Sequence, residues 1–280
     1  MIDPGIPVDR PERSPRIPVQ GQPSLLFVDD DTYMRRLMAA RLEHLGAQVE
    51  AVASGQAALT FLESHRPDLI ISDAVMPELN GFDLCRRLKA DPLLQSIPIV
   101  ILTALTRDLR QRSIEAGADD YLSKLEHEVV FRMRARLALE LGVRLAARGG
   151  EPGFGEKGSL LVVSGSKAVQ AQFESHLLKE GVPVTGVPTL AAALEQLRTK
   201  VPGVMALDLA LAPENLAEWI LHVRGLQGCA ALPILALAGK DEDVWLASLE
   251  PLIQDRLPKP LDGQESRHRV NLLLRIAALG

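Results

Sequence analysis

The sequence predicts an α/β protein that contains two doubly wound parallel sheets in tandem. Four observations support this. Short apolar segments alternate with amphipathic segments of helical period along most of the chain. Several apolar segments end in aspartate or threonine, and residues recur at a constant offset of 135 positions. The length of 280 residues suggests about two domains at roughly 150 residues each.

The composition excludes several classes of protein. With 36 acidic and 31 basic residues, the net charge of -5 argues against non-specific binding to nucleic acid. No apolar run approaches the roughly 18 residues that a membrane span needs. The two cysteines, Cys85 and Cys229, have no metal-binding spacing. We therefore expect a cytoplasmic protein without membrane or direct nucleic-acid contacts.

The chain begins with a segment rich in proline, residues 1–23, which we expect to be a flexible tail. A strand is predicted over 25–28, followed by three aspartates and a helix that ends before Gly46. Asp31 or Thr32 would cap this helix, which leaves Asp29 and Asp30 without a structural explanation.

The following segments complete one sheet. We predict strands over 48–52, 69–72, 97–102 and 120–122, and helices over 56–64, 81–89, 108–116 and from about 126 to 147. Such alternation means a parallel sheet with helices on both faces, and ligands bind such sheets at the carboxyl ends of the strands. That edge collects five polar residues: Asp29, Asp30, Asp73, Thr103 and Lys124.

Asp73 is the candidate reactive group at this edge. An aspartate that closes a strand is commonly a turn-forming residue, so Asp73 alone is a weak signal. Asp29 and Asp30 would repel it, however, unless a cation lay between the carboxylates. A hard divalent ion fits oxygen ligands, with Mg²⁺ preferred to Ca²⁺.

These residues carry a family resemblance over about residues 24–141. This part resembles a receiver domain of two-component response regulators, which implies a flavodoxin-like sheet of strand order 2-1-3-4-5. The resemblance rests on motifs in the family's order: Asp29-Asp30, Asp73 followed by Met76-Pro77 and Gly81, Thr103-Ala104, Tyr121 and Lys124.

The resemblance implies that Asp73 accepts a phosphoryl group from a histidine kinase or a phosphotransfer protein. Asp30 and Asp73 would bind Mg²⁺ directly, the Val75 carbonyl would be a third ligand, and Asp29 would act mainly through water. The ion would neutralise charge that otherwise opposes attack by a carboxylate on phosphorus.

Other positions would bind and sense the phosphoryl group. Lys124 and the Thr103 hydroxyl would contact its oxygens, together with the backbone amides of Ala74 and Ala104. Tyr121 would move into the space that Thr103 vacates, shifting a two-state equilibrium. The family usually has proline after its lysine, whereas Leu125 follows here. We expect a trans Lys124-Leu125 bond, so the lysine would approach the site along a different backbone path from that of the family.

The helix over about 126–147 is longer than one domain needs. Its apolar stripe could pair with a helix of a second subunit or of the other half of the chain. We expect its arginines to form a solvated face: Arg132, Arg134, Arg136, Arg144 and Arg148.

After a linker at 149–158, residues 159–280 repeat the pattern of residues 24–148 without a gap. The offset of 135 pairs Asp73 with Asp208 and Lys124 with Lys259. The copy is chemically incomplete, since four other positions of the site have changed, to Ser164, Gly165, Ala238 and Arg256. We expect a degenerate receiver-like domain in which Asp208 and Lys259 form an ion pair or a solvated remnant.

We therefore expect a response regulator that acts through contacts with a downstream protein, and the sequence leaves a homodimer open. No catalytic segment follows the second copy, so we expect no enzyme activity. A structural adaptor that never carries phosphate and a Mg²⁺-dependent hydrolase are the alternatives. Val75 and Leu105 would flank the approach of water to an aspartyl phosphate, and both are apolar, which predicts slow hydrolysis.

Overall fold

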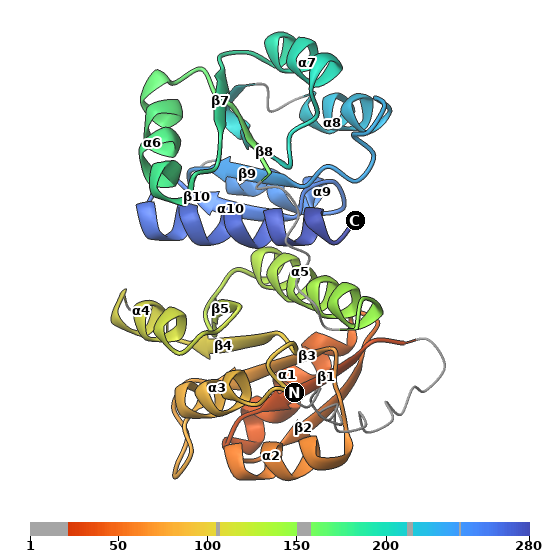
Figure 1. Cartoon of the computed structure of the whole chain (residues 1–280), viewed down its shortest axis with the longest axis vertical. Coiled ribbons are helices and arrows are strands. Elements are labelled where there is room, and N and C mark those ends of the chain that lie inside the picture. Colours follow the sequence, from red (N-terminus) through yellow and green to blue (C-terminus); the bar gives the residue numbers. More distant parts are fainter. Residues whose placement is uncertain (1–21, 105–106, 150–157, 212–214, 241) are drawn as a thin grey trace, which may run out of the picture.

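The computed structural model describes residues 22–104, 107–149, 158–211, 215–240 and 242–280. Within these ranges the chain forms two stacked α/β units, which we call the N-terminal unit (22–149) and the C-terminal unit (158–280) (Figure 1). The predicted tail lies almost entirely outside the described residues, and so does the predicted linker.

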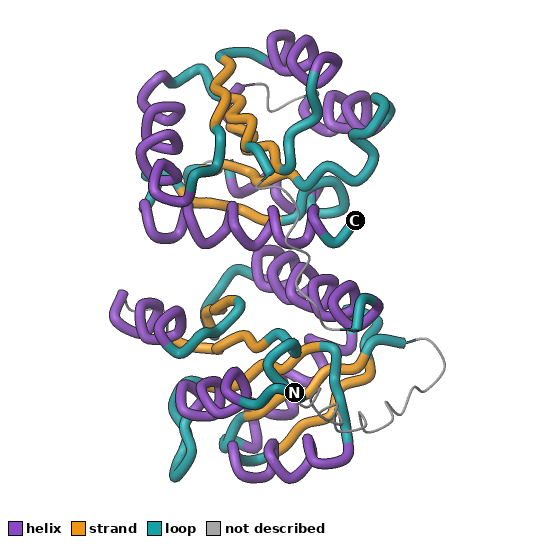
Figure 2. The backbone as a smooth tube through the Cα atoms, viewed as in Figure 1, coloured by secondary structure: helices purple, strands orange, loops and turns teal. Residues whose placement is uncertain are grey.

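The N-terminal unit contains a five-stranded parallel sheet of order β2-β1-β3-β4-β5. Helices cover both of its faces (Figure 2). The strands are β1 (Ser24–Val28), β2 (Gln48–Val52), β3 (Leu69–Asp73), β4 (Ile99–Thr103) and β5 (Asp120–Ser123), and the helices are α1 (Thr32–Glu43), α2 (Gly55–Ser64), α3 (Gly81–Ala90), α4 (Arg107–Glu115) and α5 (Glu128–Ala147).

Alternating side chains of the central strands build two separate cores. Leu26 and Ile70 point into the core on one face of the sheet, whereas Phe27 and Ile71 point into the core on the other. A strand buried on both faces needs apolar side chains at successive positions, which is why these segments read as continuous apolar runs. The prediction of a parallel sheet covered on both sides is confirmed.

The C-terminal unit repeats this architecture, with sheet order β10-β9-β8-β6-β7. Every strand lies within one residue of the position that the offset of 135 predicts, so the predicted fold class is confirmed for both halves. Its elements are β6 (Leu160–Val163), α6 (Lys167–Leu177), η1 (Leu178–Glu180), β7 (Val184–Val187), α7 (Leu190–Thr199), β8 (Val204–Asp208), η2 (Leu209–Leu211), α8 (Leu216–Arg224), β9 (Ile234–Ala238), η3 (Asp243–Trp245), α9 (Leu246–Leu249), β10 (Asp255–Pro258) and α10 (Gly263–Ala278).

Helix α5 lies between the two units (Figure 1). Val130 and Met133 join one core of the C-terminal unit, while Leu137, Leu141 and Leu145 join the other. The apolar stripe therefore packs against the other half of the chain, which was one of the two pairings that the sequence left open.

The expectation of a solvated arginine face on α5 is wrong for three of its five members. Arg132 pairs with Glu250, Arg134 is 3% exposed, and Arg144 donates to the Ile276 carbonyl at 3.0 Å. Arg136 and Arg148 are exposed, as expected. The pattern of charges could not reveal this, because the acceptors belong to elements more than a hundred residues away.

Candidate functional site

Three carboxylates gather at the carboxyl ends of β1 and β3. Asp29 and Asp30 follow β1, and Asp73 closes β3, which pairs with β1 in parallel register. One oxygen from each residue lies within 4.8 Å of the others. Asp29 is fully buried, whereas Asp30 is exposed. The predicted convergence is confirmed, and this donor set suits a hard divalent cation.

Lys124 links two of these carboxylates. Its Nζ lies 2.9 Å from Asp73 Oδ2 and 3.1 Å from Asp29 Oδ2. The Lys124-Leu125 bond is trans, as expected, and the exposed Leu125 side chain does not prevent the lysine from reaching the site. Burial alone would lower the pKa of Lys124, but the hydrogen bonds and charges of Asp73 and Asp29 raise it. The ammonium group is therefore charged at neutral pH.

The Asp73 carboxyl is a stronger base than an ordinary aspartate. Burial raises its pKa and the Asp29 charge adds to this, while the Lys124 ammonium opposes both. A bound cation would relieve the repulsion between the Asp73 and Asp29 charges, and so would a covalent bond formed by the Asp73 carboxylate.

Thr103 ends β4 beside Asp73 and is 1% exposed. Among the described residues, its Oγ1 has no hydrogen-bond partner. A buried hydroxyl without a partner costs free energy, so a ligand oxygen at this edge would satisfy it. The Ala74 N–H donates to the Leu102 carbonyl at 2.9 Å, and Ala104 is exposed. Donation from these two amides to a phosphoryl group stays a prediction.

The turn after Asp73 is shaped by Gly81. A Cβ atom at Gly81 would lie 2.1 Å from the Asp73 carbonyl oxygen, so only glycine allows this close approach. Asn80 caps α3 by accepting a hydrogen bond from the Asp83 N–H. Glu78 has a φ of 62°, a conformation that costs free energy in a non-glycine residue.

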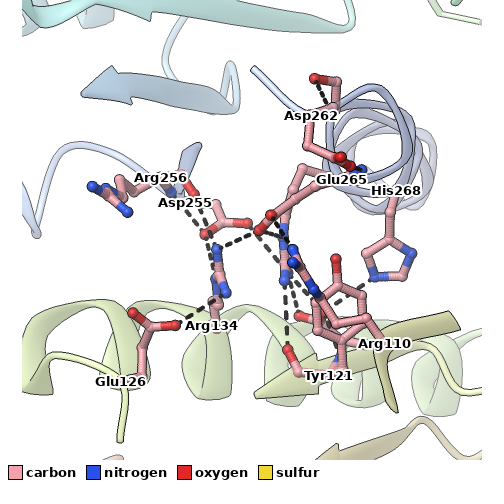
Figure 3. Close-up of polar contacts among 12 residues, drawn as sticks. Arg110, Tyr121, Glu126, Arg134, Asp255, Arg256, Asp262, Glu265 and His268 are labelled. Carbon is pink, nitrogen blue, oxygen red and sulfur yellow. Dashed lines mark hydrogen bonds and ion pairs between the residues drawn. The ribbon is translucent and has the colours of Figure 1, made fainter. Parts of the chain in front are cut away.

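Tyr121 lies on the edge strand β5, at the boundary between the two units. Its ring stacks on His268 of α10, with centroids 5.2 Å apart, and the Arg269 guanidinium lies 5.0 Å from the ring (Figure 3). Burial raises the pKa of Tyr121 to about 12. The residue predicted to sense the site therefore also contacts the C-terminal unit.

A network of buried ion pairs surrounds Tyr121, and sequence reasoning missed it. Arg134 Nε lies 3.1 Å from Asp255 Oδ1, and Arg269 Nη1 lies 2.7 Å from both oxygens of Asp120. Glu265 accepts from Arg134 and from Arg110, at 3.2 and 3.1 Å (Figure 3). The missed signal was the offset of 135, which relates Asp120 to Asp255 and Arg134 to Arg269.

The equivalent edge of the C-terminal unit holds the expected ion pair. Lys259 Nζ lies 2.8 Å from Asp208 Oδ1, and Ser164 Oγ donates to Asp208 Oδ2 at 2.7 Å. No acidic cluster that could bind a metal is present here among the described residues.

Comparison with known proteins agrees with this geometry. Residues 25–135 match the family model of the response regulator receiver domain. This part of the chain is a receiver domain. Its carboxylate cluster, lysine and buried threonine lie where the resemblance placed them, and receiver domains take part in phosphorelay signalling with histidine kinases or phosphotransfer proteins.

Curated relatives extend the comparison. Response regulator PleD of Caulobacter vibrioides is 28% identical over 268 residues, which cover 88% of this chain and 58% of PleD. Transcriptional regulatory protein AfsQ1 of Streptomyces coelicolor is 37% identical, with coverages of 44% and 53%. DNA-binding response regulator MtrA of Mycobacterium tuberculosis is 40% identical, with coverages of 40% and 50%. The chain therefore spans only half to three fifths of these relatives.

The comparison with PleD corrects one expectation. We expected no enzyme activity because no catalytic segment follows the second copy. PleD matches both copies and is much longer than the matched part, so that reasoning fails and the expectation is wrong.

Solved structures of receivers resemble the chain in sequence. The signal receiver domain of a histidine kinase from Syntrophus aciditrophicus is 41% identical, covering 42% of this chain and 89% of that one, with a TM-score of 0.40. A response regulator from Chloroflexus aurantiacus is 33% identical, covering 42% and 98%, with a TM-score of 0.41.

Two apolar residues were predicted to flank the approach of water to Asp73. Val75 is 69% exposed beside Asp73, whereas Leu105 lies outside the described residues. In the part of the chain that the structure describes, no helix is both long and apolar enough to span a bilayer.

Proposed function

We propose that the chain is a response regulator in which Asp73 accepts the phosphoryl group. The observation that carries the proposal is the arrangement around Asp73: two more carboxylates within 4.8 Å, the Lys124 ammonium at 2.9 Å, and a buried Thr103 hydroxyl without a described partner. Each of these groups has a use in phosphoryl transfer, and packing alone explains none of them.

In the proposed reaction an Asp73 oxygen forms a bond to phosphorus while the bond between phosphorus and nitrogen of a phosphohistidine breaks. The histidine ring takes the electron pair. Lys124 then shares its charge with the phosphoryl oxygens, and Thr103 donates the hydrogen bond that it lacks. Asp30, Asp73 and the Val75 carbonyl would bind Mg²⁺ directly, and Asp29 would act mainly through water. The ion would lower the repulsion between carboxylate and phosphoryl charges.

The signal would leave the site through Thr103 and Tyr121. A phosphoryl group that attracts the Thr103 hydroxyl changes the space behind it. Tyr121 lies on the neighbouring strand, two residues before Ser123, the partner of Thr103 in the β4–β5 register. Because Tyr121 stacks on His268, this change would reach α10. We propose that output is a change in protein contacts, with the C-terminal unit as a degenerate receiver domain.

Intact-mass analysis after treatment with phosphoramidate and Mg²⁺ tests the assignment. The parent chain should gain one phosphoryl group and Asp73→Asn none. Asp208→Asn is the matched control, since it removes the equivalent aspartate of the other unit, and it should be labelled like the parent. A folded parent that gains no mass would favour the structural adaptor, and labelling of Asp73→Asn would contradict the assignment.

A further inference from the structure

The loop after β9 of the C-terminal unit places a carboxylate at the edge of the sheet. Glu242 Oε2 accepts a hydrogen bond from the Gly239 N–H, and its Oε1 lies 3.4 Å from Lys259 Nζ. The Glu242 side chain is 18% exposed and that of Lys259 is 23% exposed. Two donors, one from the backbone and one cationic, thus converge on a single carboxylate.

Both donors have counterparts in the N-terminal unit. The offset of 135 relates Gly239 to Ala104 and Lys259 to Lys124. Under the proposed function the Lys124 ammonium binds the phosphoryl group, and the Ala104 amide is predicted to donate to it. The position equivalent to Glu242 is Arg107, so the N-terminal unit has no carboxylate there. The C-terminal unit therefore supplies an anion of its own where the N-terminal unit would receive one.

The neighbouring aspartate is fully occupied. Asp208 Oδ1 accepts from Lys259 and from the Ala210 N–H, at 2.8 and 3.2 Å, and its Oδ2 accepts from Ser164. Burial alone would lower the pKa of Lys259, but hydrogen bonds and charges from Asp208 and Glu242 raise it. One ammonium is thus shared between two carboxylates, as Lys124 is shared between Asp73 and Asp29.

We propose that Glu242 is a permanent internal ligand of the C-terminal unit, which takes the place of the phosphoryl group in its vestigial site. The proposal rests on the proposed function for the correspondence between the two sites. A carboxylate carries less charge than a phosphoryl group but offers the same kind of acceptor to an ammonium and an amide. The unit is consequently held in one state and does not respond to a phosphodonor.

This ligand also fixes an element that contacts the N-terminal unit. The Trp245 N–H donates to the Glu242 carbonyl at 3.2 Å, and the same segment continues through η3 and α9 to Glu250. Glu250 accepts from Arg132 of α5 at 3.1 and 2.5 Å. A loop held by Glu242 thereby keeps the Arg132 contact in position.

Titration with inorganic phosphate, followed at the Gly239 amide by NMR on the ¹⁵N-labelled full chain, tests the proposal. The parent should show no saturable shift, because Glu242 occupies the site. Glu242→Ala should show a saturable shift, and phosphate should restore the protection from hydrogen exchange that α9 loses in this variant. Adding Lys259→Met should weaken the response at least ten-fold. Restoration of this protection by phosphate would show that Glu242 occupies an anion site. If Glu242 only closes the loop, phosphate should not restore the protection.

Glu195→Ala is the control and should behave like the parent. Glu195 is exposed, and among the residues that the structure describes its ion-pair partner is Arg198 of the same helix. If Glu242→Ala distorts the loop, Glu242→Gln keeps the side-chain length, and phosphate should displace the neutral amide with lower affinity. No saturable shift in either variant, or the same shift in the parent, overturns the proposal. Labelling of Asp73 is read separately, so failure of the proposed function would leave the Gly239 result unchanged.

Discussion

Arg134 and Arg269 stand at equivalent positions of the repeat, and each pairs across the interface with the aspartate that begins the other unit's last strand. Arg134 binds Asp255, and Arg269 binds Asp120. Each arginine also donates to the backbone carbonyl of the residue that follows its partner aspartate. Arg134 donates to Arg256 at 3.2 Å, and Arg269 donates to Tyr121 at 3.5 Å. Reciprocal contacts of this kind are those of a two-fold symmetric dimer, here formed within one chain.

Removing one of these arginines should destabilise the protein strongly. Arg269 is fully buried, so Arg269→Ala leaves Asp120 with His268 as its remaining side-chain partner. Breaking a buried ion pair costs about 3–5 kcal/mol. Urea denaturation of the full chain measures the loss of free energy of unfolding. Arg136→Ala, on the exposed side of α5, is the control and should lower this free energy by about 0.5 kcal/mol or less. Equal midpoints for the two variants would contradict the importance of the pair.

Gly81→Ala should disturb the phosphoacceptor turn. Its Cβ would lie 2.1 Å from the Asp73 carbonyl oxygen, so the backbone on one side must move. We expect slower labelling of Asp73 by phosphoramidate and a lower melting temperature. Gly165→Ala is the matched control, because its Cβ would have no neighbour closer than 3.5 Å. Unchanged labelling of Gly81→Ala would show that the turn does not position Asp73.

Mg²⁺ should stabilise the N-terminal unit through its acidic cluster. Binding to the folded state alone raises stability by RT ln(1 + [L]/Kd), so the melting temperature should increase with Mg²⁺ and fall back when a chelator is added. Asp30→Asn should weaken this response. Asp31→Asn should retain it, because Asp31 caps α1 and asparagine caps a helix equally well. Equal responses of both variants would exclude Asp30 as a ligand.

The buried phenol of Tyr121 gives a readout of the interface. Its pKa is raised to about 12 by burial, against about 10 in an unfolded chain. The folded protein therefore keeps this contribution to stability below about pH 10 and loses it as the pH rises toward 12. In Tyr33→Phe, which leaves one tyrosine, absorbance should report ionisation near pH 12. Adding Arg269→Ala removes a charge that lowers the pKa of Tyr121, but it should also open the interface, and the resulting exposure of the phenol should move its pKa toward 10.

How far the sequence predicted the protein depended on the range of the interactions. The strands and Asp73 could be found because apolar runs and the polar residues that end them are local features. Lys124 and Thr103 needed the family's motif order, since nothing local distinguishes them. The charge pattern around Arg134 did not show its role, because burial of a charged side chain depends on partners in a distant element. The repeat, which places Arg269 at the equivalent position, was the signal that pointed to it. The repeat could not predict the role of Glu242, because the equivalent residue of the N-terminal unit is Arg107, which is not acidic.

The lifetime of the aspartyl phosphate is a final prediction. Hydrolysis needs a water molecule in line with the bond between phosphorus and oxygen, and a polar neighbour would orient that water. Val75 is apolar and 69% exposed beside Asp73, so the parent should lose its phosphoryl group slowly. Val75→Asn should lose it several-fold faster when the labelled protein is followed by intact mass. Val244→Asn changes an equally exposed valine of the C-terminal unit and should leave the rate unchanged. If Val75→Asn decays at the rate of the parent, an apolar residue at this position does not set the lifetime.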